Sequence, residues 1–358
     1  MLQDSEQQDE ALALAPRVTG EYIAERASHV TVIDEGVAKC ADIITNVVKE
    51  NKIRSSSWLQ HPLHPVDKER EYQISWCFLV DTINFSFWPC TSNEEPFAVT
   101  QNGTKHTGYF SLCACVNRSL QDGLNLLDTN VLEKLTFDQL RHCFRGDGGT
   151  IMPLLGERLR ILHEAAAVLR QKFAGSFCNV VEQSDRCAQT LLRLLVDNFP
   201  SYRDTATYKG KRVSFLKRAQ ILAADLNNCL QTSPSEPYFV DIDSLTMFAD
   251  YRVPQALCYL GALRYSHELR ESLHRAPARA LANVGERNVT AEMECELRAC
   301  SIRACDLIVQ NVRCRPGVPG CQNVNAATVD YFLWCYRRQH AAEIEAKVPF
   351  HRVRSIFY

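Results

Sequence analysis

The segment 213–230 constrains the fold most, because it repeats apolar residues at helical spacing on more than one face. These residues are Phe215, Leu216, Ile221, Leu222, Leu226 and Leu230. A helix that is apolar on most sides must be enclosed by other elements. Segments 154–173 and 183–199 also follow the helical period. The sequence therefore predicts a mostly α-helical protein with 213–230 as its central helix.

Other helices follow from the same pattern. Residues 22–51, 254–273 and 326–347 each repeat apolar side chains at helical spacing and are predicted as helices. Pro254 suits the first turn of the second of these. Residues 72–88 are apolar, aromatic and β-branched, so they are predicted as either a strand or a buried helix.

A single β-hairpin is predicted within residues 97–109. Two short β-type runs there flank Asn102-Gly103, a pair that favours a tight hairpin turn. The predicted fold class is thus mostly α with a small β-hairpin element. Residues 1–16 are predicted as a disordered lead and residues 17–358 as a single domain.

The chain carries 16 cysteines, which could serve disulfides, metal binding or core packing. Residues 1–10 are acidic and polar, and they lack the basic start and apolar run of a signal peptide. We therefore expect reduced thiols, most of them in the core. No Cys-x-x-Cys pair occurs and no motif indicates a cofactor, so we expect neither a metal nor a cofactor. The expected location is the cytoplasm, with the nucleus left open.

Charge is nearly balanced, with 40 basic and 42 acidic residues and a formal net charge of −2. No block of basic residues occurs, so a polymeric nucleic acid is not an expected partner. No apolar run reaches the length needed to cross a membrane. These properties argue against a DNA base-excision glycosylase and favour a small-molecule ligand. The oligomeric state stays open.

The stretch 239–255 gathers carboxylates, aromatic rings and a guanidinium in a mostly apolar setting. The side chains are those of Phe239, Asp241, Asp243, Phe248, Asp250, Tyr251 and Arg252. A charged group in such a setting must be paired, capped or neutralised. The same groups would suit a flat, polar, phosphorylated ligand.

Several blocks of sequence, spread from about Tyr22 to Tyr358, point to one family. They are Asp81-Thr-Ile-Asn-Phe-Ser-Phe-Trp88, Gly108-Tyr-Phe-Ser-Leu-Cys-Ala114, Lys217-Arg-Ala-Gln-Ile-Leu222, Thr246-Met-Phe-Ala-Asp-Tyr-Arg252, Asp330-Tyr-Phe-Leu-Trp334 and Val348-Pro-Phe-His-Arg352. In this order they resemble the queuosine salvage proteins, which are queuosine 5'-phosphate N-glycosylases. Blocks in a shared order are far more specific than any one of them.

The resemblance implies hydrolysis of the N-glycosidic bond of queuosine 5'-phosphate, which releases queuine for salvage into tRNA modification. It also implies an architecture similar to that of the helix-hairpin-helix DNA glycosylases. A non-catalytic helical module that binds a nucleotide or a protein partner is the alternative. Queuine is a 7-deazaguanine and lacks the ring nitrogen that purine glycosidases commonly protonate. More of the catalysis must then come from stabilising the sugar cation.

Two carboxylates, Asp330 and Asp241, are predicted to carry the reaction. Asp330 lies in an apolar-aromatic helical segment; a buried partner of a helix end is the alternative, but the position resembles the family's catalytic Asp. Asp243 precedes a periodic apolar run and is predicted to cap a helix, which leaves Asp241 free. A free carboxylate can accept both adjacent donors of a guanine-like edge. Phe239 is predicted to stack on the base, with core packing as the alternative.

His61 and Asn325 complete the predicted pocket by resemblance. His61 matches the family's base-contacting His, with His64 as the alternative, because the spacing after Trp58 is one residue shorter here. The sequence also departs from the family at Cys335, where an Asp usually follows the tryptophan of the Asp330 block. We expect this change to alter the surroundings of the site without loss of activity.

A 5'-phosphate needs cations and oriented donors. Lys217 and Arg218 lie in one family block and Arg252 in another, so all three are predicted to bind substrate. For Arg252 the alternative is an ion pair with Asp250.

Overall fold

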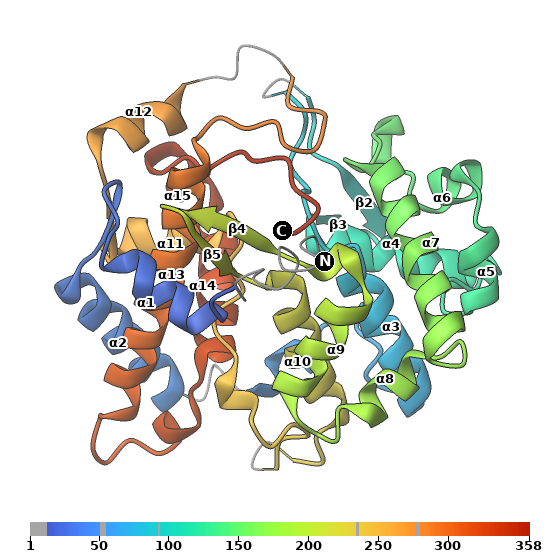
Figure 1. The fold of residues 1–358 in the computed structure, drawn as a ribbon, viewed down its shortest axis with the longest axis horizontal. Helices are drawn as coiled ribbons and strands as arrows, with labels where there is room; N and C mark the ends of the chain where they lie inside the picture. The colour runs from blue at the N-terminus through green and yellow to red at the C-terminus, as the bar shows by residue number, and fades with distance from the viewer. Residues whose placement is uncertain (1–12, 51–54, 92–93, 234–235, 276–279) are drawn as a thin grey trace, which may run out of the picture.

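The computed structural model describes residues 13–50, 55–91, 94–233, 236–275 and 280–358. Within these ranges the chain is mostly helical (Figure 1). The helices are α1 (Pro16–Ala24), α2 (Asp34–Lys49), α3 (Arg70–Thr82), α4 (Tyr109–Gln121), α5 (Thr129–Lys134), α6 (Phe137–Cys143), α7 (Leu155–Lys172), α8 (Phe177–Gln183), α9 (Ala188–Asn198), α10 (Lys217–Leu230), α11 (Val253–Leu260), α12 (His267–His274), α13 (Ala291–Arg313), α14 (Ala326–Gln339) and α15 (Ala341–Lys347). Short 3-10 turns occur at Ser55–Gln60, Asp147–Gly149, Pro200–Tyr202, Ile242–Ser244 and Cys321–Asn323.

Short antiparallel strands pair in three places within the described ranges. The pairs are β1 (Val30–Val32) with β6 (Leu263–Tyr265), β2 (Ala98–Gln101) with β3 (Thr104–Thr107), and β4 (Thr205–Tyr208) with β5 (Lys211–Ser214). The β2–β3 hairpin is the predicted one. Its turn residues Asn102 and Gly103 have φ of 51° and 77°, the left-handed backbone that this pair adopts readily. The prediction of a mostly α fold with a small hairpin is confirmed.

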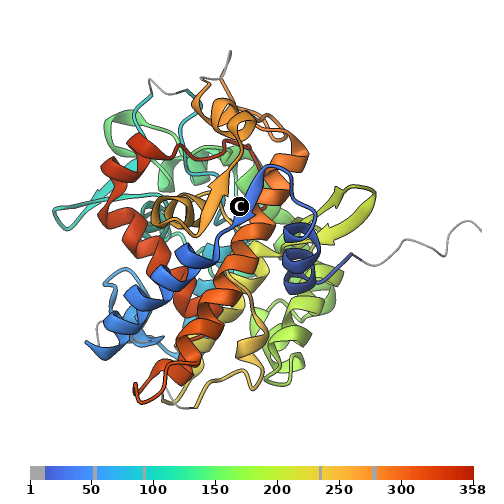
Figure 2. The ribbon, with the colours of Figure 1, turned by 90° about the vertical axis from the view of Figure 1, so that its left-hand side faces the viewer.

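Two hydrophobic cores share the molecule. One is built mainly on α3, α4, α7, α9 and α10, and the other on α2, α11, α13 and α14. These helices lie in the right and left halves of Figure 1. In the second core, α13 packs against both α1 and α2 (Figure 2). Of the 16 cysteines, all are free thiols and nine are buried, which confirms that most serve the core.

Helix α10 is the predicted central helix. Burial extends around it to polar and charged side chains, including Lys217, Arg218 and Asp225. It begins at Lys217 and not at residue 213, because Lys209 and Gly210 turn the chain with φ of 46° and 79° and place residues 211–214 in β5.

Two predicted helices are interrupted by strands. Gly261, with φ of 90°, ends α11, and the chain then forms β6 against β1 before α12 begins. β1 in turn separates α1 from α2. A Cβ at Gly36 would lie 1.9 Å from the carbonyl oxygen of Gly261, so this close approach requires glycine. Residues 72–88, left open between strand and helix, are helical only as far as Thr82.

The predicted disordered lead, residues 1–16, lies outside the described residues up to residue 12. Its remainder is structured: Leu14 exchanges backbone hydrogen bonds with Arg212 and Ser214 at β5, and Pro16 begins α1. Across the described ranges, none of the helices combines the length and the apolar character required to span a bilayer.

Candidate active site

A cavity of about 900 Å³ lies between the two cores. Its walls include residues of both cores, and aromatic side chains dominate them. These are Trp58, Phe85, Phe87, Trp88, Phe97, Tyr109, Phe110, Phe248, Tyr251, Tyr331, Trp334, Phe350 and Tyr358. A volume of this size accommodates a nucleotide.

One face of helix α10 lines the cavity. Lys217, Ile221 and Asp225 follow one another at intervals of four residues, and all three line the wall. Residues at this spacing share a helix face. An ammonium group and a carboxyl group are thereby held about 12 Å apart along the helix axis.

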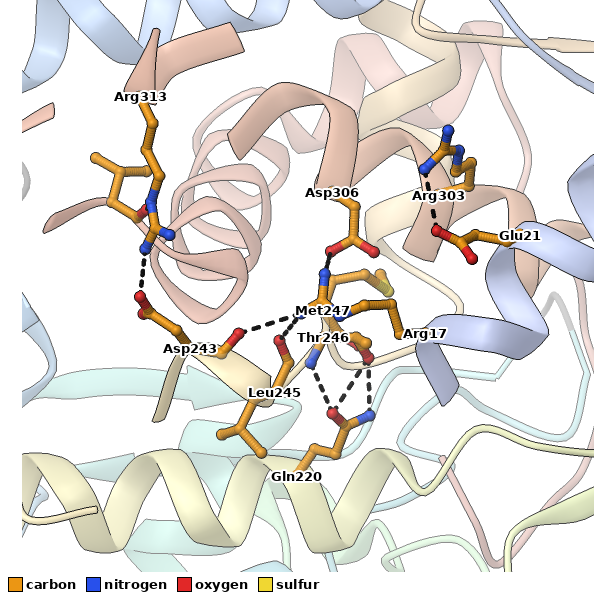
Figure 3. Close-up of polar contacts among 11 residues, drawn as sticks. Arg17, Glu21, Gln220, Asp243, Leu245, Thr246, Met247, Arg303, Asp306 and Arg313 are labelled. Atoms are coloured by element: carbon orange, nitrogen blue, oxygen red, sulfur yellow. Dashed lines mark hydrogen bonds and ion pairs between the residues drawn. The ribbon is translucent and has the colours of Figure 1, made fainter. Parts of the chain in front are cut away.

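The segment 243–250 brings two further residues, Phe248 and Asp250, to the cavity. Beyond the turn at Ile242–Ser244 it is neither helix nor strand, so side chains from other elements hold it. Arg17 of α1 donates from Nη2 to the carbonyl oxygens of Asp243 (3.2 Å) and Leu245 (2.8 Å), as Figure 3 shows.

Gln220 of α10 holds the next residue of this segment. Its Oε1 accepts the backbone N–H of Thr246 at 2.7 Å, and its Nε2 donates to the Thr246 hydroxyl at 2.9 Å (Figure 3). Arg313 of α13 binds the carboxylate of Asp243 at 2.7 Å. The backbone leading to Asp250 is therefore fixed from both cores.

Asp330 of α14 lines the cavity and is only 6% exposed. Its Oδ1 accepts the backbone N–H of Phe248 at 2.9 Å. Burial raises the pKa of Asp330 well above its usual range and the charge of Asp250 raises it further, against the hydrogen bond from Phe248 and the charge of Lys217. These influences favour the protonated acid.

Asp250 and Lys217 are the nearest charged neighbours of this acid. Asp250 Oδ1 accepts the backbone N–H groups of Arg252 and Val253, both at 2.8 Å, at the start of α11. Lys217 Nζ donates to the carbonyl oxygen of Asn84 at 3.1 Å. Burial lowers the pKa of Lys217, while the carboxylates of Asp250, Asp81 and Asp330 act in the opposite direction. Two carboxyl groups and an ammonium group thus line the same cavity and act on one another's pKa.

One end of the cavity is aromatic and contains Asp225. Burial raises the pKa of Asp225 well above its usual range, and the nearby carboxyl group of Asp81 raises it further. The charges of Lys217 and a hydrogen bond from Trp58 oppose this shift. Asp225 is also close enough to Tyr109 and Tyr331 to raise the pKa of each. Asp225 therefore lies near aromatic side chains in surroundings that favour its protonated form.

His64 lies in the same aromatic end, stacked on Trp58 with ring centroids 3.9 Å apart. Burial lowers the pKa of His64 to about 3, so the ring is neutral at physiological pH. Its Nδ1 is 2.7 Å from the carbonyl oxygen of Trp58 and must donate to it. Nε2 is then the acceptor from the Tyr109 hydroxyl at 3.2 Å.

Four guanidinium groups line the cavity: those of Arg252, Arg337 and Arg352 lie near Glu345, and that of Arg338 lies over the rings of Phe110 and Trp334. Glu345 pairs with Arg252 at 2.9 Å and also with Arg337. Burial lowers the pKa of Arg337, Arg338 and Arg352, and the charge of Arg252 lowers each further. One carboxylate cannot neutralise four cations, so this end, here called the arginine end, attracts anions.

The structure brings three of the predicted site residues together in this cavity, namely Asp330, Lys217 and Arg252. Lys217 lies beside the carboxyl groups and not in the arginine end. Arg252 pairs with Glu345, so the predicted alternative of an ion pair with Asp250 is wrong. Asp250 instead bonds the backbone at the start of α11.

Asp241 does not line the cavity. Its carboxylate accepts the N–H groups of Ala188 (2.6 Å) and Gln189 (3.1 Å) in the first turn of α9. Asp243, predicted as the cap, is instead an exposed partner of Arg313. The predicted assignment of these two aspartates is therefore wrong, because the orphan N–H groups that need a carboxylate belong to a helix distant in sequence.

The other predicted residues also lie outside the lining and have structural contacts. Phe239 is fully buried in the first core, and Asn325 caps α14 by accepting the N–H of Thr328 at 3.0 Å. Arg218 is buried and donates to the carbonyl oxygens of Thr82 and Ser201. His61 stacks on Phe110 at 3.8 Å, and it is His64 that reaches the cavity. The prediction of one pocket holding all of these residues is wrong.

Sequence reasoning missed Asp225, Arg337, Arg338 and Arg352, and it named Phe248 and Asp250 in the stretch 239–255 without assigning them to the site. A signal existed for Asp225, which follows Lys217 by eight residues on the most apolar helix of the chain. Phe248 and Asp250 lie within a family block and have the same Phe-x-Asp spacing as Phe239 and Asp241. Cys335 is hydrogen-bonded to Tyr331 of the wall, and burial raises the pKa of its thiol.

The fold and the cavity define a mostly helical protein with a large pocket lined by aromatic rings, carboxyl groups and guanidinium groups. A family model described as queuosine salvage protein matches residues 63–358. The chain is 40% identical over 349 residues to the Queuosine 5'-phosphate N-glycosylase/hydrolase of Bos taurus, covering 96% of this chain and 99% of that protein. The proteins of that name from Mus musculus and Schizosaccharomyces pombe are 41% and 36% identical, over 96% and 94% of this chain and 99% and 98% of theirs. The chain belongs to the queuosine salvage protein family, as predicted.

Proposed function

We propose that this protein hydrolyses the N-glycosidic bond of queuosine 5'-phosphate, which yields queuine and ribose 5-phosphate and supplies queuine for salvage. The observation that carries the proposal is a single cavity with an aromatic end, an arginine end, and two carboxyl groups in its wall. These three parts correspond to the base, the phosphate and the sugar of one nucleotide. The printed names of the relatives agree with this reaction.

The sugar is proposed to bind at Asp250 and Asp330. Cleavage of the bond to the base develops an oxocarbenium-like cation, which a nearby carboxylate stabilises. Asp250 takes this role, held by two backbone N–H bonds, and replaces Asp241 in the mechanism. Asp330, favoured in its acid form, donates a proton toward the departing base and then receives one from the attacking water.

The base is proposed to lie against the aromatic end, with Phe248 and Trp58 among its contacts. A 7-deazaguanine has no ring nitrogen at position 7, so hydrogen bonds to its other edges must assist its departure. Asp225 in its acid form can donate to the carbonyl oxygen of the base while its own carbonyl oxygen accepts a ring N–H. This role replaces the one predicted for Asp241.

The 5'-phosphate is proposed to lie in the arginine end, where Arg252, Arg337 and Arg352 surround Glu345. A guanidinium matches two phosphate oxygens at once. Lys217 is assigned instead to the carboxyl groups, whose negative charges it balances, and Arg218 has no place in the site. The helix-hairpin-helix kinship of the fold and a cytoplasmic or nuclear location remain part of this proposal, as does a small molecule as the only partner.

The test is incubation of the purified protein with queuosine 5'-phosphate, followed by chromatography for free queuine and ribose 5-phosphate. Asp250→Asn serves as the inactive control, and queuosine without the phosphate serves as the comparison substrate. Release of queuine by the wild type alone would support the hydrolase. Tight binding of the nucleotide without any release would indicate the binding module instead.

A further inference from the structure

We propose that Arg17, on the N-terminal helix α1, is a positioning residue that fixes the backbone carrying Phe248 and Asp250 to the cavity. The inference rests on the proposed catalytic function of Asp250. It concerns a part of the chain that lies before residues 63–358, the span matched by the family.

The segment 245–250 depends on outside support, because it forms neither helix nor strand. Leu245 to Ala249 are buried, with Met247 and Ala249 fully so. Buried backbone N–H and C=O groups must find partners, and a segment without a regular ladder finds them in side chains. The position of Asp250 is therefore set by the residues that provide those partners.

The guanidinium of Arg17 contacts three acceptors at once (Figure 3). Its Nη2 donates to the carbonyl oxygens of Asp243 and Leu245, and its Nη1 pairs with the carboxylate of Asp306 on α13. The side chain of Asp306 is 4% exposed and that of Arg17 is 39% exposed. A planar guanidinium can bridge a carboxylate and two carbonyl groups, whereas a lysine ammonium cannot match this geometry.

Helix α1 is itself held firmly. A Cβ at Gly20 would lie 2.8 Å from Cγ2 of Ile302, so α1 and α13 pack at glycine distance. Leu14, just before the helix, is bonded to β5 on both its backbone groups. Arg17 thus extends from a helix whose position is fixed by packing on α13 and by the backbone hydrogen bonds of Leu14 to β5.

Other residues of the segment are hydrogen-bonded to α10 and to Asp330. Gln220 binds Thr246, and Phe248 donates to Asp330, so only a few residues separate the carbonyl groups held by Arg17 from both catalytic carboxyl groups. Release of those carbonyl groups would shift Asp250 relative to Asp330. A displacement of about 1 Å at a reacting centre can cost about 100-fold in rate.

The experiment compares Arg17→Met and Arg17→Lys with Arg303→Met. Arg303 lies in the same view, on α13, and pairs with the exposed Glu21; among the residues that the structure describes, no hydrogen bond or ion pair joins it to the segment (Figure 3). Leu132→Ala, on α5 and in the first core, serves as a variant that is destabilised away from the segment. Each protein is measured for kcat, KM, thermal unfolding and hydrogen exchange of the peptide 243–250.

Arg17→Met is expected to lower kcat by roughly 10- to 100-fold, with faster exchange in 243–250. Arg17→Lys, which retains the charge next to Asp306, should recover part of the loss. Arg303→Met should keep kcat within about twofold, and Leu132→Ala should melt earlier but keep kcat per folded molecule. If Arg17→Met does not fold, Arg17→Lys still tests the proposal, with a smaller loss of kcat and faster exchange in 243–250 as the expected result.

A lower melting temperature in Arg17→Met with unchanged kcat and unchanged exchange in 243–250 would overturn the proposal. Equal loss of kcat in Arg303→Met would also overturn it. If the wild type itself releases no queuine, the proposed function fails, but exchange still decides the present inference. Faster exchange in 243–250 for Arg17→Met alone supports the positioning role in that case.

Discussion

Replacement of Arg352 by methionine tests whether the arginine end binds the 5'-phosphate. Arg352 lines the cavity with its guanidinium 5.2 Å from the ring centroid of Phe350. Within the described parts of the chain it forms no ion pair with a carboxylate, whereas Arg252 and Arg337 share Glu345. Its charge is therefore available to a ligand. Methionine retains the apolar stem and removes only the charge and the donors.

The expected magnitude follows from one charged contact. A hydrogen bond to a charged group contributes about 1.5–3 kcal/mol. Loss of one such contact with phosphate should lower kcat/KM for queuosine 5'-phosphate by about 10- to 150-fold. Queuosine lacks the phosphate, so its kcat/KM should stay within about twofold. The ratio of kcat/KM for queuosine 5'-phosphate to kcat/KM for queuosine should thus fall by nearly the same factor of about 10 to 150.

The assay measures queuine release from both substrates by chromatography, with Arg315→Met as a matched control. Arg315 pairs with Asp42 at the surface, and its replacement removes the same charge away from the cavity. At physiological salt, an exposed charge away from the cavity is largely screened from a ligand bound in the cavity. Equal losses on both substrates would show that Arg352 has a structural function. No loss on either would place the phosphate elsewhere.

Three further predictions concern the carboxyl groups. Asp330→Asn and Asp250→Asn should each lower kcat by about 100- to 1000-fold or more, with substrate affinity within about tenfold by calorimetry; near-normal turnover would remove that residue from the mechanism. Asp241→Asn should keep kcat within about twofold but lower the free energy of unfolding in urea by about 0.5–2 kcal/mol, because it weakens the N-terminus of α9; a stable, inactive variant would contradict this. Since the pKa values of Asp225 and Asp330 are raised and both are proposed to act as acids, kcat/KM should decline as pH rises through those values. Asparagine at position 225 cannot ionise, so in Asp225→Asn the fall of kcat/KM at high pH should reflect one ionisation fewer than in the wild type. The same fall in both proteins would argue against Asp225 as an acid in the reaction.

The sequence predicted the helices better than the ends of the helices. The apolar pattern of 213–230 identified α10 correctly, since burial on several faces leaves a strong signal. It could not show that residues 211–214 pair with β4, because four residues carry little strand periodicity. The same limit applies to β1 and β6, which meet from opposite ends of the chain.

The sequence also indicated the kinds of side chain that line the cavity but not which residues provide them. Asp241 and Asp250 lie in one stretch with similar neighbours, and each follows a phenylalanine by two residues. One carboxylate binds the start of α9 and the other reaches the cavity. Whether Asp241 or Asp250 reaches the cavity depends on where α9 and α11 begin in the folded chain, and no local sequence pattern contains that information. Asp330 was found because its block is specific to the family.

The sequence by itself determined the family, the mostly helical fold and the central helix, because these follow from residue order and from apolar spacing along one segment. Only the tertiary structure decided which acids line the cavity, that His64 and not His61 lines it, and that Arg252 and Arg337 both pair with Glu345. The physical reason is that the partners of a side chain often belong to elements distant in sequence. The backbone groups that bind Asp241 and Arg218 come from such elements, whereas Asp250 and Asp330 line the cavity while each also accepts backbone N–H groups.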